Sequence, residues 1–83
     1  MSEQAILAMV KEILEKKGDT APVGIEDSLV YSGRLRSMQI IELASQLEIT
    51  FAIDFGVTGF NQYDFDSVLS ILALLSTTSN TQR

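Results

Sequence analysis

Few residues of this chain could take part in covalent chemistry. Its 83 residues contain no Cys and no His, which excludes disulfides, zinc–thiolate sites, Cys or His nucleophiles and imidazole general bases. The side chains that could still react include the hydroxyl groups of serine. Ser37 directly precedes a periodic apolar run, where a helix is expected to begin. This local pattern by itself favours a plain helix N-cap.

Ser28 and two pairs of acidic residues are weaker candidates for a chemical role. Ser28 lies between Asp27 and Leu29 but precedes no long helix, which favours a turn residue. The acids Glu26 and Asp27, and likewise Asp64 and Asp66, form close pairs in the sequence. Nothing else converges on either pair, so loop and cap roles are expected instead of metal binding or acid–base catalysis.

Apolar residues recur with helical spacing in three stretches. The first covers residues 3–17 and ends before Gly18, a residue type that suits the position after a helix. The second runs from Ser37 to Phe51, and the third follows Asp66, which is expected to be its N-cap. The three apolar faces are Ile6, Met9, Val10, Ile13 and Leu14; Ile40, Leu43, Ala44, Leu47 and Phe51; and Val68, Ile71, Leu72 and Leu75.

The connecting segments complete an all-α prediction. Residues 18–35 form a long connection whose apolar residues should pin it to the core. Residues 49–57 alternate as in a strand, but no second run could pair with them, so residues 52–57 are predicted to be an extended linker. A short helical turn is expected in residues 58–64. The chain is thus predicted to be one domain, residues 1–76, with three main helices, one short helical turn and a frayed polar tail at residues 77–83.

The composition of the chain disfavours several classes of function. Six Lys and Arg against eleven Asp and Glu give 6 − 11 = −5, which argues against binding to a nucleic-acid backbone and disfavours a small DNA-binding domain. No apolar run is long enough to span a membrane, and no basic stretch followed by an apolar one indicates a secretory signal. The expectation is a cytoplasmic domain, acidic and monomeric, that is not itself an enzyme.

The residues around the start of the second helix allow a more specific interpretation. Gly33-Arg34-Leu35-Arg36-Ser37-Met38, followed by an apolar helix, resembles the acyl carrier protein family. That family is a small four-helix bundle in which a Gly-x-x-Asp-Ser-Leu/Met motif opens the second helix. The resemblance covers roughly residues 6–75 and depends largely on helix order and acidity, since the motif is short. It places the modified serine of the family on Ser37, its flexible glycine on Gly33, and its mid-helix acid on Glu42.

This resemblance implies a function. The chain would carry acyl groups as thioesters on 4′-phosphopantetheine, attached to Ser37 from coenzyme A. It would serve fatty-acid, polyketide or related specialised acyl biosynthesis. Its implied partners are a phosphopantetheinyl transferase and acyl-loading ligases or synthases. An aminoacyl or peptidyl carrier, and an unmodified carrier-like interaction domain, remain open as alternatives.

The chain also departs from the family pattern. Arg36 replaces the usual Asp before the serine, and Arg34 adds a second cation beside it. Residues 34–54 carry two arginines and three acids, a net charge of 2 − 3 = −1, so the usual acidic docking face is thinned. Docking is therefore expected to depend more on apolar burial. The residues expected to face partners are Arg34, Arg36, Met38, Ile41, Glu42 and Glu48.

Overall fold

The computed structural model describes residues 3–55 and 61–78, and in these residues the chain is all-helical. Helix α1 spans Glu3–Lys16, α2 spans Ser37–Phe51, the 3₁₀ helix η1 spans Gln62–Phe65, and α4 spans Val68–Thr78. The described part of the chain contains no strand. The predicted fold class, three main helices with one short helical turn, is therefore confirmed.

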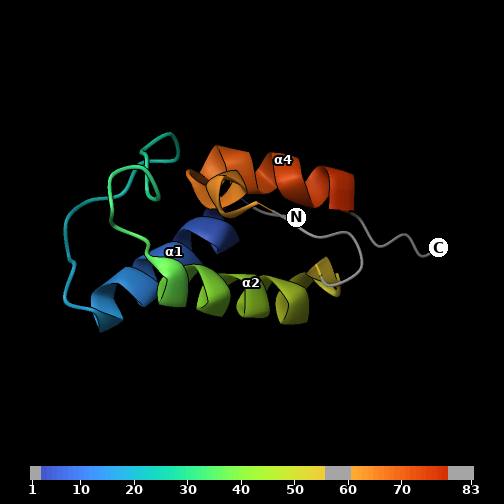
Figure 1. Ribbon diagram of the computed structural model, residues 1–83, viewed down its shortest axis with the longest axis horizontal. Helices are drawn as coiled ribbons and strands as arrows, with labels where there is room; N and C mark the ends of the chain where they lie inside the picture. Colours follow the sequence, from blue (N-terminus) through green and yellow to red (C-terminus); the bar gives the residue numbers. More distant parts are fainter. Residues whose placement is uncertain (1–2, 56–60, 79–83) are drawn as a thin grey trace.

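Figure 1 shows the three main helices arranged beside one another. Their buried apolar residues belong to one core cluster. The residues predicted for the three apolar faces are buried, apart from Met9, Phe51 and Leu72, which are partly buried against the core. Phe65 of η1 is fully buried and packs edge-on against Phe55, with ring centroids 5.8 Å apart. Thus η1 is an integral part of the bundle.

The long connection between α1 and α2 is pinned to this core as predicted. Val23, Leu29 and Leu35 are buried, and Ile25 and Val30 pack against the core. Gly18 follows α1 with a φ of 91°, the left-handed conformation expected after a helix C-terminus. The connection between α1 and α2 therefore has a fixed conformation up to the start of α2.

Two local predictions differ from the structure. The predicted linker begins with Ala52 in the left-handed conformation, φ 56°, and its N–H donates to the Glu48 carbonyl. A sharp turn, not a continuous extended run, therefore ends α2; residues 56–57 of the predicted linker lie outside the described residues. The predicted helical turn is η1, which begins at Gln62 and ends at Phe65; residues 58–60 lie outside the described residues.

The N-cap prediction for α4 is wrong. Ser67, not Asp66, caps this helix, because its Oγ accepts from the N–H of Ser70 at 3.1 Å. The Asp66 carboxylate accepts hydrogen bonds from the α1–α2 connection instead. Helix α4 also continues to Thr78, two residues into the tail predicted to be frayed, with Thr77 Oγ1 donating to the Leu74 carbonyl; residues 79–83 lie outside the described residues.

None of the helices in the described residues has both the length and the apolar character needed to cross a membrane.

Candidate functional site

The candidate site lies at the start of α2. Arg36 is the N-cap residue, with extended backbone angles, and Ser37 is the first helical residue. Ser37 is therefore not the N-cap considered as its ordinary alternative. Since an arginine side chain has no hydrogen-bond acceptor, the helix begins without a side-chain N-cap. The Gln39 side chain accepts from the Arg36 N–H at 3.0 Å and thereby holds the first turn.

The hydroxyl of Ser37 is available for chemistry. The residue is exposed, and its Oγ makes no hydrogen bond to any residue in the described ranges. Ser28 differs in this respect, because its Oγ donates to Asp66 Oδ1 at 2.9 Å in a partly buried position. The structure therefore favours Ser37 over Ser28 as an accessible hydroxyl.

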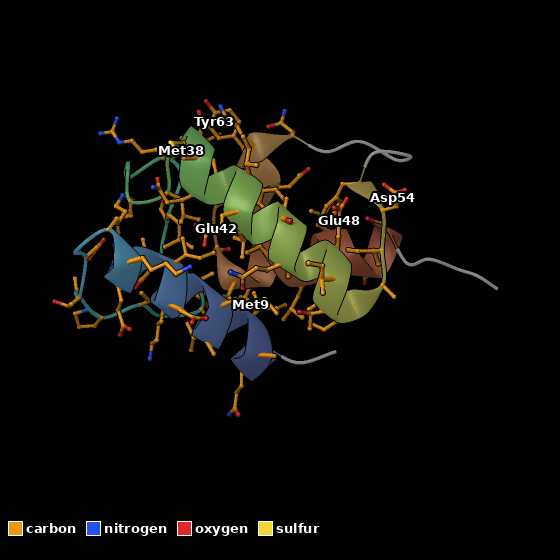
Figure 2. All side chains as sticks on the ribbon, turned by 90° about the horizontal axis from the view of Figure 1, so that it is seen from below. Met9, Met38, Glu42, Glu48, Asp54 and Tyr63 are labelled. Atoms are coloured by element: carbon orange, nitrogen blue, oxygen red, sulfur yellow. The ribbon has the colours of Figure 1, made fainter. Side chains whose placement is uncertain are left out.

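Ser37 lies on the rim of an open groove. The groove has a volume of about 390 Å³ and is bounded by the last residues before α2, the first turn of α2, and Gln62 and Tyr63 of η1. Figure 2 shows Tyr63 near Met38, at the end of the molecule where α2 begins. A second hollow, about 220 Å³, is lined by Ser37, Ile40, Ile41 and Gln62.

One wall of the larger groove is a pair of stacked tyrosines. The ring centroids of Tyr31 and Tyr63 are 4.6 Å apart, and the ring planes differ by 16°. Tyr31 is 73% exposed and Tyr63 is 44% exposed. The sequence analysis did not identify either residue, because nothing in the spacing of two distant tyrosines indicates that they meet.

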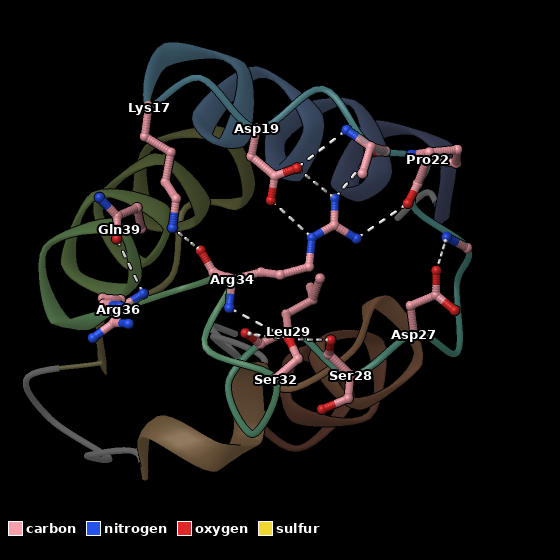
Figure 3. A network of polar contacts seen from close by, with 12 residues as sticks. Lys17, Asp19, Pro22, Asp27, Ser28, Leu29, Ser32, Arg34, Arg36 and Gln39 are labelled. Atoms are coloured by element: carbon pink, nitrogen blue, oxygen red, sulfur yellow. Dashed lines mark hydrogen bonds and ion pairs between the residues drawn. The ribbon is translucent and has the colours of Figure 1, made fainter.

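The guanidinium of Arg34, a residue predicted to face partners, is paired within the chain. Its Nε and Nη2 donate to the two carboxylate oxygens of Asp19 at 2.9 and 3.1 Å, and its guanidinium also donates to the carbonyls of Ala21 and Pro22. Figure 3 shows this network around the guanidinium. Hydrogen bonding by Asp19 raises the pKa of Arg34, and the same bond lowers the pKa of Asp19. The ion pair with Asp19 therefore closes the connection between α1 and α2 on itself.

Arg36 has different surroundings. Its side chain is exposed and makes no ion pair with any residue in the described part of the chain. Gly33, just before it, has a φ of 82°, and a Cβ placed there would lie 3.9 Å from Arg36 Nη2. The flexible-glycine position of the motif thus has a left-handed backbone that favours glycine.

Asp66 organises the other side of the connection. Its Oδ1 accepts from Ser28 Oγ at 2.9 Å and from the N–H groups of Leu29, Val30 and Tyr31 at 3.2, 2.9 and 3.0 Å. Burial opposes ionisation of this carboxyl, but the N–H of Tyr31 and the other donors outweigh it, so the pKa of Asp66 lies below its ordinary value. Sequence reasoning missed this role because the donors are backbone groups far away in the sequence.

Met38 and Ile41, the apolar side chains predicted to face partners, are 78% and 66% exposed. Ile49, a third apolar residue of α2, is 80% exposed. These three side chains therefore lie outside the core. Met38 and Ile41 flank Ser37 on one turn of α2, whereas Ile49 lies near the opposite end of the helix.

The two acids predicted to face partners have internal roles. Glu42 pairs with Lys16 of α1, with Oε2 and Nζ 2.8 Å apart, and this contact raises the pKa of Lys16. Glu48 Oε2 accepts from the N–H of Phe55 at 2.9 Å and secures the turn after α2. Each of the two carboxylates is therefore partly exposed and also takes part in a contact within the chain.

A scan of protein-family models, a search of curated proteins and a search of solved structures each found no significant match to this chain.

Proposed function

We propose that this chain is a carrier protein that holds acyl groups as thioesters on a 4′-phosphopantetheine arm attached to Ser37. The observation that carries the proposal is the hydroxyl of Ser37, which is exposed and makes no hydrogen bond to a described residue at the uncapped start of α2. Its sequence surroundings, from Gly33 to Met38, resemble the attachment motif of acyl carrier proteins.

The residues around Ser37 fit a phosphodiester. The positive end of a helix, with N–H groups that have no intrahelical partner, favours an anion. The side chain of Arg36 provides no acceptor for these N–H groups, and its exposed guanidinium, near Gly33, adds a positive charge at the same end of α2. The positive charge that is unfavourable at a bare helix start therefore becomes favourable when a phosphate is attached to Ser37 Oγ.

The attachment step balances with coenzyme A as the only co-substrate. Ser37 Oγ attacks the phosphorus that bears the pantetheine chain and forms a new P–O bond. The pyrophosphate bond of coenzyme A breaks, adenosine 3′,5′-bisphosphate leaves, and the hydroxyl proton passes to the transferase or to water. The pantetheine thiol then supplies the sulfur nucleophile that this Cys-free chain lacks.

Intact mass measurement tests the proposal. The purified apo protein is incubated with coenzyme A and a broad-specificity phosphopantetheinyl transferase, and the mass should rise by that of one phosphopantetheine. Ser37→Ala should abolish the gain. Ser28→Ala is the matched control and should retain it, since the Ser28 hydroxyl is bound to Asp66.

The same measurement distinguishes the alternatives. No gain in the wild-type protein would favour an unmodified interaction domain. A gain that persists in Ser37→Ala would place the arm on another residue and refute the assignment. Offering the modified protein acyl or aminoacyl groups with loading enzymes then separates an acyl carrier from an aminoacyl or peptidyl carrier.

A further inference from the structure

The groove beside Ser37 has no role in the attachment step, and its position raises the question of what occupies it. It extends from Ser37 to the stacked rings of Tyr31 and Tyr63. Any chain attached to Ser37 Oγ begins on the rim of this groove. Resting on the proposed function, we propose that the groove is a cradle for the proximal part of the pantetheine arm, which packs against the Tyr31–Tyr63 pair.

The lining of the groove matches the chemistry of this part of the arm. Next to its phosphate, pantetheine carries a carbon with two methyl groups, then a hydroxyl and an amide. The groove offers apolar surface from Val30, Leu35 and Ile40. It also offers the tyrosine hydroxyls and the amide of Gln62 as hydrogen-bonding groups. An amphipathic chain satisfies both kinds of surface.

The openness of the groove argues against a long aliphatic acyl chain as its occupant. Tyr31 is 73% exposed and Tyr63 is 44% exposed, so this wall faces water. A fully apolar chain lying here would keep one side in water and would therefore gain little from burial. The arm itself, with alternating apolar and polar groups, does not have this disadvantage.

The tyrosine wall is held in place before any arm is attached. Asp66 Oδ1 accepts from the N–H of Tyr31 at 3.0 Å and from that of Val30 at 2.9 Å. Tyr63 belongs to η1, and the last residue of η1, Phe65, is fully buried. Both rings therefore extend from anchored backbone, and binding of the arm requires little ordering of the protein.

The arrangement can be tested by nuclear magnetic resonance on the modified protein. The chain contains two tyrosines and no tryptophan, so its tyrosine ring signals and intrinsic fluorescence arise only from this wall. Isotope-filtered spectra of labelled protein carrying an unlabelled arm should show nuclear Overhauser contacts between the two methyl groups of the arm and both tyrosine rings. Acrylamide should also quench the tyrosine fluorescence less in the modified protein than in the apo protein.

A variant and a matched control sharpen the test. The Tyr63→Ala protein should still gain the mass of the arm. The contacts between the methyl groups of the arm and the ring of Tyr31 should be lost. Ile49→Ala, which removes another exposed apolar side chain near the far end of α2, should keep the wild-type contacts. Because the contacts are first sought in the wild-type protein, misfolding of Tyr63→Ala would leave the test intact.

Each outcome has a clear meaning. A mass gain with contacts to the tyrosine rings supports the cradle. A mass gain with contacts only to Ile41, in the smaller hollow, or with no contacts to the protein, overturns the cradle and leaves the proposed function standing. No mass gain refutes the proposed function, and the cradle with it, because no tethered chain would then exist to occupy the groove.

Discussion

Arg34 and Arg36 lie two residues apart before the same helix, yet their guanidinium groups have different surroundings. That of Arg34 donates to Asp19 and to the carbonyls of Ala21 and Pro22, and its side chain is 19% exposed. That of Arg36 is exposed and makes no ion pair with any residue the structure describes. Residue type alone therefore does not separate a structural arginine from one available to a phosphate or a partner.

The same contrast extends to two regions of the molecule. The braced connection, residues 19–34, is closed on itself by the ion pair of Arg34 with Asp19 and is tied to the start of α4 through Asp66. The open helix start comprises Arg36, Ser37, Met38 and Ile41, all of them exposed. Substitutions in the braced connection and its anchors should change stability, whereas those in the open helix start should change modification and docking.

The largest expected effect on stability is that of Asp66→Ala. It removes the acceptor of Ser28 and of the N–H groups of Leu29, Val30 and Tyr31. Since partly buried donors are left without a partner, the free energy of unfolding should fall by about 2–3 kcal/mol, measured by urea denaturation. Glu26→Ala, an exposed acid of the same connection, is the control and should change it by less than about 0.5 kcal/mol. Equal effects of the two variants would show that Asp66 does not brace the connection.

The next effect concerns docking at the open helix start. Ile41 is 66% exposed, so Ile41→Ala should leave the melting temperature unchanged. If a transferase or loading enzyme buries this side chain, the loss of about 1.5–3 kcal/mol should raise Kd roughly tenfold or more. Glu48→Ala should have a smaller effect on Kd, since an exposed ion pair contributes about 0–1 kcal/mol.

Salt dependence provides a second measurement of the same interface. Apolar contacts are insensitive to screening, so Kd should change little between low and high salt. If Kd rises steeply with salt and Ile41→Ala leaves Kd unchanged, docking is electrostatic, through Glu42, Glu48 and Asp54.

The two arginines themselves allow a direct comparison of the regions. Arg34→Ala should lower the melting temperature by several degrees, because Asp19 and two backbone carbonyls lose their donor. Arg36→Asp should leave the melting temperature nearly unchanged. It should instead speed modification or loading by a housekeeping enzyme that docks on an acidic helix start, because it removes a like-charge contact. The reverse pattern in thermal and kinetic assays would exchange the roles assigned to the two residues.

A smaller change in the free energy of unfolding is expected at acid pH. The pKa values of Asp19 and Asp66 lie below the ordinary value of 3.8. A carboxyl with a lowered folded-state pKa stabilises the fold above its unfolded-state pKa, and this contribution is lost as the pH falls through the folded-state pKa. The free energy of unfolding should therefore decline as the pH falls below about 4. Denaturation of Asp66→Asn across the same pH series should show a shallower decline, whereas a decline parallel to the wild type would mean that Asp66 contributes nothing to it.

Much of the architecture could be predicted from local patterns. Helical spacing of apolar residues located α1, α2 and α4, because burial of one face requires that period. The bounds of α2, from Ser37 to Phe51, agree with the sequence analysis. The core residues of the connection were also recognisable, since Val23, Leu29 and Leu35 are apolar in an otherwise polar segment.

The remaining features depend on contacts between residues distant in the sequence. The N-cap of α4 was misassigned because Asp66 is a good capping residue, and only the fold brings the N–H groups of residues 29–31 to its carboxylate. Arg34 appeared available because its partner Asp19 lies across the connection. Tyr31 and Tyr63 meet only because η1 packs beside the segment before α2.

The sequence by itself therefore determined the helices, their buried faces and the serine at the start of α2, because each depends on short-range periodicity and residue type. Only the tertiary structure decided which charges are paired, which acid anchors the connection and which aromatic rings form the groove. These features depend on the distance between side chains from separate segments, and packing of the core sets that distance.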